Sequence, residues 1–426
     1  MRNTQRWLRL TVGGPTTQAS VSAMTAMGIR GALQGCLLIF LARGMGSTDF
    51  GAFVAMTSLA LGLGTLAPVG QGYLVLLHSA ISDERGRRAL ARALPITFLG
   101  SLCLYPIYGL LAGTLQPDPL QWWPMVLLGL SELTCAPLTL VMAQRLQGLG
   151  SVGTAQSVFS ILSSLRLGGV LAVAALHEAL TLSAYAAIYL ASAAAVLLLT
   201  WALASRAGSL PDPRNYRRPS SKSIRPGLPY AAMRLSAYGP GELDKVIAPS
   251  ALGLSAAGNY AFVSRAMGLA MLPVNALVAA SQPRITRLLK TSPHDGFRLA
   301  ATSLIMSAMW GTLCCIALWV VGAVALGALA GDRYDLALTS HALALACIPM
   351  SVRITAGGLL LPVQRPMIRA ASEFSGMACL AIAMPLLAAR HGIAGAAAAV
   401  IGSELIMALL LSLAALRHLR RLGRPQ

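Results

Sequence analysis

Residues 181–203, TLSAYAAIYLASAAAVLLLTWAL, form an apolar stretch that is followed by a basic segment at 205–228, SRAGSLPDPRNYRRPSSKSIRPGL. A run of about twenty apolar residues is long enough to cross a bilayer as a helix. Basic residues collect in the loops that remain on the cytoplasmic side. These two segments therefore predict a membrane-spanning helix that ends in the cytoplasm.

Working outward from this helix, eleven further apolar stretches of similar length follow one another along the chain. Arg and Lys are concentrated in every second segment between these stretches. The predicted cytoplasmic segments contain 24 of them, and the outer segments contain three, Arg43, Arg333 and Arg390. This bias predicts that both termini are cytoplasmic. The first stretch is a full-length span, so no cleaved signal peptide is expected. The predicted spans are 22–43, 52–77, 93–113, 120–143, 157–176, 181–203, 229–249, 257–280, 300–329, 338–361, 369–389 and 393–416.

The composition excludes a soluble protein, because 56% of the residues are hydrophobic and only 11% are charged. The net charge of +19 would favour nucleic acid in a soluble protein, but here it marks cytoplasmic loops that face anionic lipids. All seven cysteines fall inside spans and the six histidines are scattered. With no metal-ligand spacing and no phosphate-binding glycine loop, we expect no metal, no cofactor and no nucleic-acid partner.

The basic segment 205–228 lies near the middle of the chain and is predicted to link an N-terminal six-helix lobe, 1–204, to a C-terminal six-helix lobe, 229–426, with a basic cytoplasmic tail. Three residues of the first lobe recur as identical or similar residues 207 positions later in the second lobe, which supports a parallel repeat. We predict an all-α integral membrane protein of about twelve transmembrane helices, with lobes related by a pseudo-two-fold axis along the membrane normal. The repeated pairs are Gly46 and Gly253, Gly51 and Gly258, and Phe53 and Tyr260.

Short motifs around these repeated residues resemble those of the polysaccharide and O-antigen flippases of the multidrug/oligosaccharidyl-lipid/polysaccharide exporter superfamily. They are Leu41–Gly46 with Phe50–Phe53, Asp244-Lys245, Ala257–Phe262, and Gln282–Arg284, together with Arg265, Pro273 and the segment Gly331–Tyr334. The resemblance implies alternating-access movement of polyprenyl-pyrophosphate-linked oligosaccharides to the outer leaflet of the bacterial inner membrane, for surface polysaccharide assembly. The candidate partners are polysaccharide assembly proteins and, as coupling ion, Na⁺ or H⁺. One departure is the use of 30 Arg and 3 Lys where many members have a lysine-rich interior.

Charged side chains inside the spans are the candidate site residues, because an ionisable group at mid-bilayer costs at least ~2.5–3.5 kcal/mol on insertion scales. A guanidinium donates paired hydrogen bonds to phosphate oxygens and stays charged. The alternative is a set of structural ion pairs, with Glu132 or Glu404 as a partner for Arg30. The cations predicted to bind substrate are Arg30, Arg166, Arg234, Arg265 and Arg353.

The seventh span contains Gly239-Pro240-Gly241 just before Glu242 and Asp244. Broken helices often mark ion or substrate sites in transporters, so we predict an interrupted helix there, with Glu242 and Asp244 as a possible coupling-ion site. A structural ion pair between Asp244 and Arg265 is the alternative.

The sequence also allows two other classes of function. A multidrug or other amphipathic-substrate exporter of the same superfamily would favour acidic and aromatic groups, and only 6% of the residues are aromatic. A polytopic polysaccharide polymerase or ligase usually needs a large outer loop that carries its catalytic groups. The predicted outer loops are short, so we do not expect an enzyme.

Overall fold

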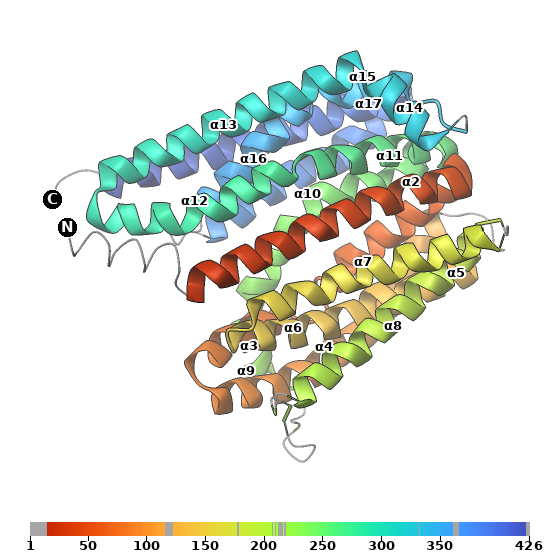
Figure 1. The fold of residues 1–426 in the computed structure, drawn as a ribbon. Helices are drawn as coiled ribbons and strands as arrows, with labels where there is room; N and C mark the ends of the chain where they lie inside the picture. The colour runs from red at the N-terminus through yellow and green to blue at the C-terminus, as the bar shows by residue number, and fades with distance from the viewer. Residues whose placement is uncertain are drawn as a thin grey trace. The chain divides into compact units, whose positions relative to one another are not determined.

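The computed structural model of the chain describes residues 15–422, apart from 116–121, 177–178, 207, 209, 212–215, 217–218, 332 and 361–365. Within these residues the chain is helical and has no strand (Figure 1), which confirms the predicted all-α class. The chain forms two compact units. Unit 1 comprises Met1–Leu37, Leu63–Leu111 and Pro119–Ala231, and unit 2 comprises Leu38–Gly62, Ala112–Asp118 and Ala232–Gln426.

Unit 1 is built from the first part of α2 and from the helices up to the start of α10. Its core includes Val75, Leu90 and Val141, which are fully buried. The helices are α2 (Pro15–Gly64), α3 (Gln71–Ile81), α4 (Asp83–Leu115), α5 (Trp122–Gly129), the π-helix η2 (Leu130–Cys135), α6 (Ala136–Gly148), α7 (Val152–Ala175), α8 (Leu182–Arg206), α9 (Ser221–Ile224) and the 3₁₀ turn η4 (Arg225–Gly227).

Unit 2 contains the rest of α2 and the helices that follow the basic segment. Helices α12, α13, α16 and α17 run side by side (Figure 1), around a core that includes Ile285, Leu359 and Leu411. The helices are α10 (Leu228–Leu252), α11 (Leu254–Ala270), α12 (Leu272–Thr291), α13 (Pro293–Val320), α14 (Gly322–Ala330), α15 (Ala337–Ala344), α16 (Cys347–Leu359) and α17 (Pro366–Leu422).

Eight helices of the described chain are long and apolar enough to cross a membrane, or nine if the bent pair α15 and α16 forms one span. Two of these, α2 and α17, are bent at residues with non-helical dihedral angles, Gly46 and Gly392. The two bends fall at predicted junctions, between the first and second spans and between the eleventh and twelfth. The multi-pass character is confirmed, and the number twelve stays a prediction.

The predicted interruption of the seventh span is wrong, because α10 continues through Gly239, Pro240 and Gly241. A proline inside a helix removes one hydrogen bond, but its fixed φ suits the helix, so it can bend the helix without ending it. The breaks occur elsewhere. The turn after Gly64 contains Val69 and Gly70 with positive φ, and Met271, which is 207 residues after Gly64, separates α11 from α12.

The repeated glycines form a symmetric contact inside unit 2. Gly46 and Gly253 share one backbone conformation, with φ of 77° and 84° and ψ of 171° and 159°. A Cβ atom on Gly51 would lie 2.3 Å from the Leu254 carbonyl oxygen, and one on Gly258 would lie 1.8 Å from that of Ser47. Residues 47 and 51 are each 207 positions before 254 and 258, so the two halves of the contact are equivalent.

An aromatic cluster lies beside this contact. Ring centroids of Phe50 and Phe262 are 6.3 Å apart, and the Tyr334 ring is 5.6 Å from that of Phe262. Burial raises the pKa of the Tyr334 phenol, which keeps this ring neutral. The loop before α15 therefore packs against the middle of α11 through apolar contacts.

The loop between α3 and α4 is held by Arg145, whose side chain is fully buried. Its Nη2 donates to the Asp83 carbonyl oxygen at 3.1 Å and to the Asp83 carboxylate, while Nε and Nη1 have no hydrogen-bond partner. The nearby residues Arg85, Arg87 and Arg88 are exposed, so their predicted contact with anionic lipids is sterically allowed.

We expect Asp83→Ala to destabilise the protein by about 1.5–3 kcal/mol, because it removes the carboxylate from a buried guanidinium. Arg145→Met should cost less, because it removes the buried charge and its two unsatisfied nitrogens together. The measurement is the thermal unfolding midpoint in detergent. Equal midpoints for the two variants would contradict this asymmetry.

Candidate functional site

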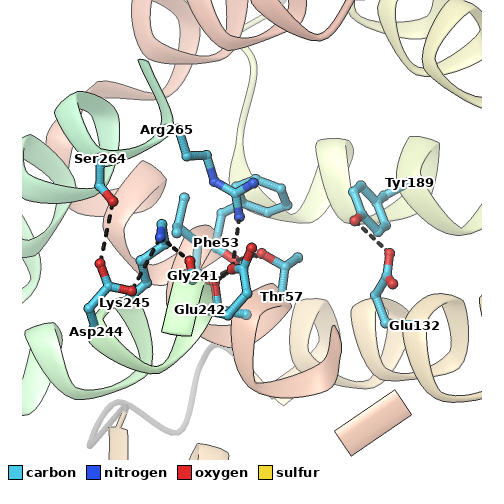
Figure 2. A network of polar contacts seen from close by, with 12 residues as sticks. Phe53, Thr57, Glu132, Tyr189, Gly241, Glu242, Asp244, Lys245, Ser264 and Arg265 are labelled. Atoms are coloured by element: carbon cyan, nitrogen blue, oxygen red, sulfur yellow. Dashed lines mark hydrogen bonds and ion pairs between the residues drawn. The ribbon is translucent and has the colours of Figure 1, made fainter. Parts of the chain in front are cut away.

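Asp244 lies at the centre of a buried polar cluster on α10 and α11 in unit 2. The hydroxyl group of Tyr260 donates to its Oδ2 at 2.6 Å. Figure 2 shows two further contacts: the Ser264 hydroxyl donates to Oδ2 at 3.3 Å, and the Lys245 ammonium lies 3.2 Å from Oδ1. The ion pair considered between Asp244 and Arg265 is not formed. Asp244 instead uses its sequence neighbour, and both of its oxygens are engaged.

Glu242, which lies two residues before Asp244 on α10, is the carboxylate that pairs with Arg265. The two side chains are 3.8 Å apart (Figure 2). Ser58 donates a hydrogen bond to Glu242 Oε2 at 2.6 Å. One-third of the Arg265 side chain is exposed, and its Nε has no hydrogen-bond partner. Arg265 therefore keeps donor capacity beyond its ion pair.

Arg353 on α16 forms a buried ion pair with Glu404 on α17. Arg353 Nε lies 2.5 Å from Glu404 Oε2, and both side chains are less than one-tenth exposed. Arg369 pairs in the same way with the buried Glu373 at 3.0 Å. Glu404 is therefore the partner of Arg353, and not of Arg30 as the sequence allowed.

In unit 1 the π-helix η2 carries Glu132, for which the sequence predicted no role beyond an ion pair with Arg30. Tyr189 on α8 donates to Glu132 Oε1 at 2.6 Å (Figure 2), and Arg166 Nη2 on α7 lies 3.4 Å from the same oxygen. The Arg166 guanidinium also stacks on the Tyr189 ring, 3.3 Å from its centroid. Arg166 thus belongs to a three-residue cluster within its own unit.

Arg30 and Arg234 contact aromatic rings. The Arg30 guanidinium lies 5.5 Å from the centroid of Phe159 in unit 1, and that of Arg234 lies 5.6 Å from the centroid of Tyr238 in unit 2. Arg234 Nε is buried without a hydrogen-bond partner. Among the residues that the structure describes, no carboxylate pairs with Arg234.

The charge balance inside the spans is therefore basic. Each of the five carboxylates in the predicted spans pairs with an Arg or Lys, and Arg30 and Arg234 add two further cations. Residues 15–422, in their described parts, contain no group of three His, Cys, Asp or Glu that could hold a metal. The pairs are Glu132–Arg166, Glu242–Arg265, Asp244–Lys245, Glu373–Arg369 and Glu404–Arg353.

The fold is that of transporters of the MATE family in the MOP superfamily. A multidrug resistance MATE transporter in an inward-facing conformation matches with a TM-score of 0.73 at 15% identity, over 94% of this chain and 98% of that one. An outward-facing multidrug resistance MATE transporter matches with a TM-score of 0.63 at 13% identity, over 98% and 99% of the two chains.

A third similar structure is a MOP superfamily transporter from Pyrococcus furiosus, described as having a binding pocket of reversed polarity that suggests a different function. It matches with a TM-score of 0.59 at 14% identity, over 98% of this chain and 99% of that one. No protein-family model and no curated protein sequence matches the chain. The structural likeness establishes the fold, and the substrate has to be argued from the charges.

Proposed function

We propose that this protein is an alternating-access flippase of the bacterial inner membrane, with both termini in the cytoplasm. It moves polyprenyl-pyrophosphate-linked oligosaccharides from the inner to the outer leaflet for surface polysaccharide assembly. The observation that carries this proposal is the charge balance inside the spans, where every described carboxylate is paired and cations are in excess. Such an interior favours an anionic substrate.

The arginines supply the chemistry that a pyrophosphate needs. A guanidinium keeps its charge in a membrane interior and donates parallel hydrogen bonds to phosphate oxygens. Arg234 has a buried Nε without a partner, and Arg166 and Arg265 each have one as well. These donors would be satisfied by phosphate oxygens. Arg353 is less well supported as a substrate ligand, because Glu404 already balances its charge.

Export of cationic drugs is the second candidate, since the fold is shared with multidrug resistance transporters. A cationic substrate would have to displace a basic residue from one of the paired carboxylates. The Pyrococcus furiosus structure is a precedent in this fold for linking pocket polarity to a different function. The electrostatic cost of separating a buried ion pair favours the anionic substrate.

Glu242 and Asp244 stay candidates for the coupling-ion site, with Na⁺ or H⁺ as the ion. The Lys245 ammonium already lies against Asp244, and Ser58 and Arg265 already contact Glu242. A metal cation would have to displace these groups. A proton would require less rearrangement.

We expect Arg234→Gln to lower the initial rate of lipid flipping by roughly tenfold or more at subsaturating substrate, since a charge-assisted hydrogen bond contributes about 1.5–3 kcal/mol. The measurement uses proteoliposomes that contain a fluorescent polyprenyl-pyrophosphate saccharide, followed by its accessibility to an impermeant quencher. The matched control is Arg287→Gln, an exposed arginine of the same unit.

The parent protein should move the pyrophosphate lipid and should not move a cationic dye such as ethidium. Movement of ethidium without movement of the lipid would overturn the proposal in favour of multidrug export. Equal lipid flipping by Arg234→Gln and Arg287→Gln would remove Arg234 from the substrate site.

A further inference from the structure

The helix that carries Glu132 contains a π-helical insertion, which is unusual in a long apolar helix. Leu130–Cys135 form this insertion between α5 and α6. Such insertions are rare and occur frequently at functional sites, because they change the direction in which the following side chains point. A carboxylate on an insertion of this kind is a candidate for a functional role.

Glu132 is held unevenly by its neighbours. Tyr189 and Arg166 both contact Oε1 of its carboxylate. The Arg166 contact is long, at 3.4 Å, and involves a single nitrogen. A protonated carboxyl group would therefore lose only one weak ion pair. Asp244 differs, because both of its oxygens are engaged.

Arg166 has a second stabilising contact that does not depend on the charge of Glu132. Its guanidinium stacks on the Tyr189 ring at 3.3 Å, a cation–π contact that persists if Glu132 is neutral. Arg166 Nε is buried without a hydrogen-bond partner. Protonation of Glu132 would thus leave Arg166 in place with its charge uncompensated, and able to bind an anion.

We propose that Glu132, Arg166 and Tyr189 form a proton-controlled anion site, in which Glu132 binds a proton and thereby releases Arg166 to bind the phosphate oxygens of the substrate. The anionic class of the substrate rests on the proposed function, whereas proton binding by Glu132 does not. The other titratable groups facing η2 are Tyr105, Tyr108 and Tyr185 on the packed helices, and Cys135 on η2 itself.

The proposal fixes the sign of the coupling. Ionised Glu132 competes with a phosphate for Arg166, so protonation of Glu132 strengthens anion binding, and anion binding strengthens proton uptake by the same factor. Affinity for a polyprenyl pyrophosphate should therefore rise as the pH falls, by at most about tenfold per pH unit for one proton. Glu132→Gln, which mimics the protonated acid, should bind tightly at all pH values tested.

The first experiment tests proton binding without substrate. Infrared difference spectra of the purified protein at stepped pH report the C=O stretch of protonated carboxyl groups. A band present in the parent and in Glu84→Gln, but absent in Glu132→Gln, is the expected result. A spectrum of Glu132→Gln identical to that of the parent would overturn the proposal.

The second experiment tests the coupling to the anion. The affinity for a polyprenyl pyrophosphate is measured against pH for the parent, Glu132→Gln and Glu84→Gln, so that titration of the ligand itself cancels in the comparison. An equal pH dependence in the parent and in Glu132→Gln would overturn the coupling. If the parent binds no pyrophosphate lipid while the infrared band of Glu132 is present, the proposed substrate fails and the proton site stands.

Discussion

Replacing Gly258 by alanine is expected to destabilise the protein by at least the ~1–3 kcal/mol typical of an overpacked core. The added Cβ would lie 1.8 Å from the Ser47 carbonyl oxygen, a backbone atom that cannot rotate away. The helices would have to separate, and the hydrogen bond between Ser47 and Ser255 would be lost. The measurements are the thermal unfolding midpoint and the yield of monodisperse protein in detergent.

The control lies on the same helix. Gly268 is also in α11, and a Cβ atom there would meet nothing within 4 Å, so Gly268→Ala should be neutral or slightly stabilising. Gly51→Ala should resemble Gly258→Ala, because it occupies the equivalent position in the symmetric contact. Since one helix separation relieves both clashes, the double variant should be less destabilised than the sum of the singles. Equal stability of Gly258→Ala and Gly268→Ala would contradict the contact.

The sequence is sufficient to predict the helical membrane class, because span length and loop charge depend only on local composition. It also locates the repeated glycines, since a position that needs a positive φ or a close helix approach leaves few alternatives to glycine. Gly253 satisfies the first requirement and Gly258 the second. Their shared spacing with Gly46 and Gly51 made the repeat detectable.

Residue types alone do not decide where the helices break. Gly239-Pro240-Gly241 has the composition of a break and is helical, whereas Met271, which is followed by Pro273 in the first turn of α12, separates two helices. Tertiary packing decides whether a weak helical segment is held together. The break after Gly64 and the one at Met271 occur at equivalent positions of the repeat, and a proline lies close to each of them, Pro68 and Pro273.

The candidate site was predicted at the level of residue type and not of pairing. The sequence gives only the depth of each residue in the membrane, counted from the end of its predicted span. Several carboxylates lie at a similar depth, so depth could not identify Glu404 as the partner of Arg353, nor Glu242 as that of Arg265. The π-helical insertion adds a further obstacle at Glu132, because it rotates the helix register and changes which face the side chain occupies.

The second large effect is expected for Glu404→Ala, which should destabilise the protein by about 3–5 kcal/mol. The variant leaves the Arg353 guanidinium buried without its carboxylate, since both side chains are less than one-tenth exposed. Glu84→Ala, which removes the partner of an exposed Arg88, should change stability by less than about 1 kcal/mol. Thermal unfolding midpoints in detergent provide the comparison.

The double variant Arg353→Met/Glu404→Leu separates the two roles that Arg353 could have. Replacing both members of a buried pair by apolar residues of similar size is often neutral for stability, so the double variant should recover most of the loss seen in Glu404→Ala. A double variant no more stable than the single one would show that the pair is not the source of the effect. A recovered double variant that still flips the pyrophosphate lipid would make Arg353 a structural cation. A recovered double variant that does not flip it would place Arg353 with the substrate-binding arginines.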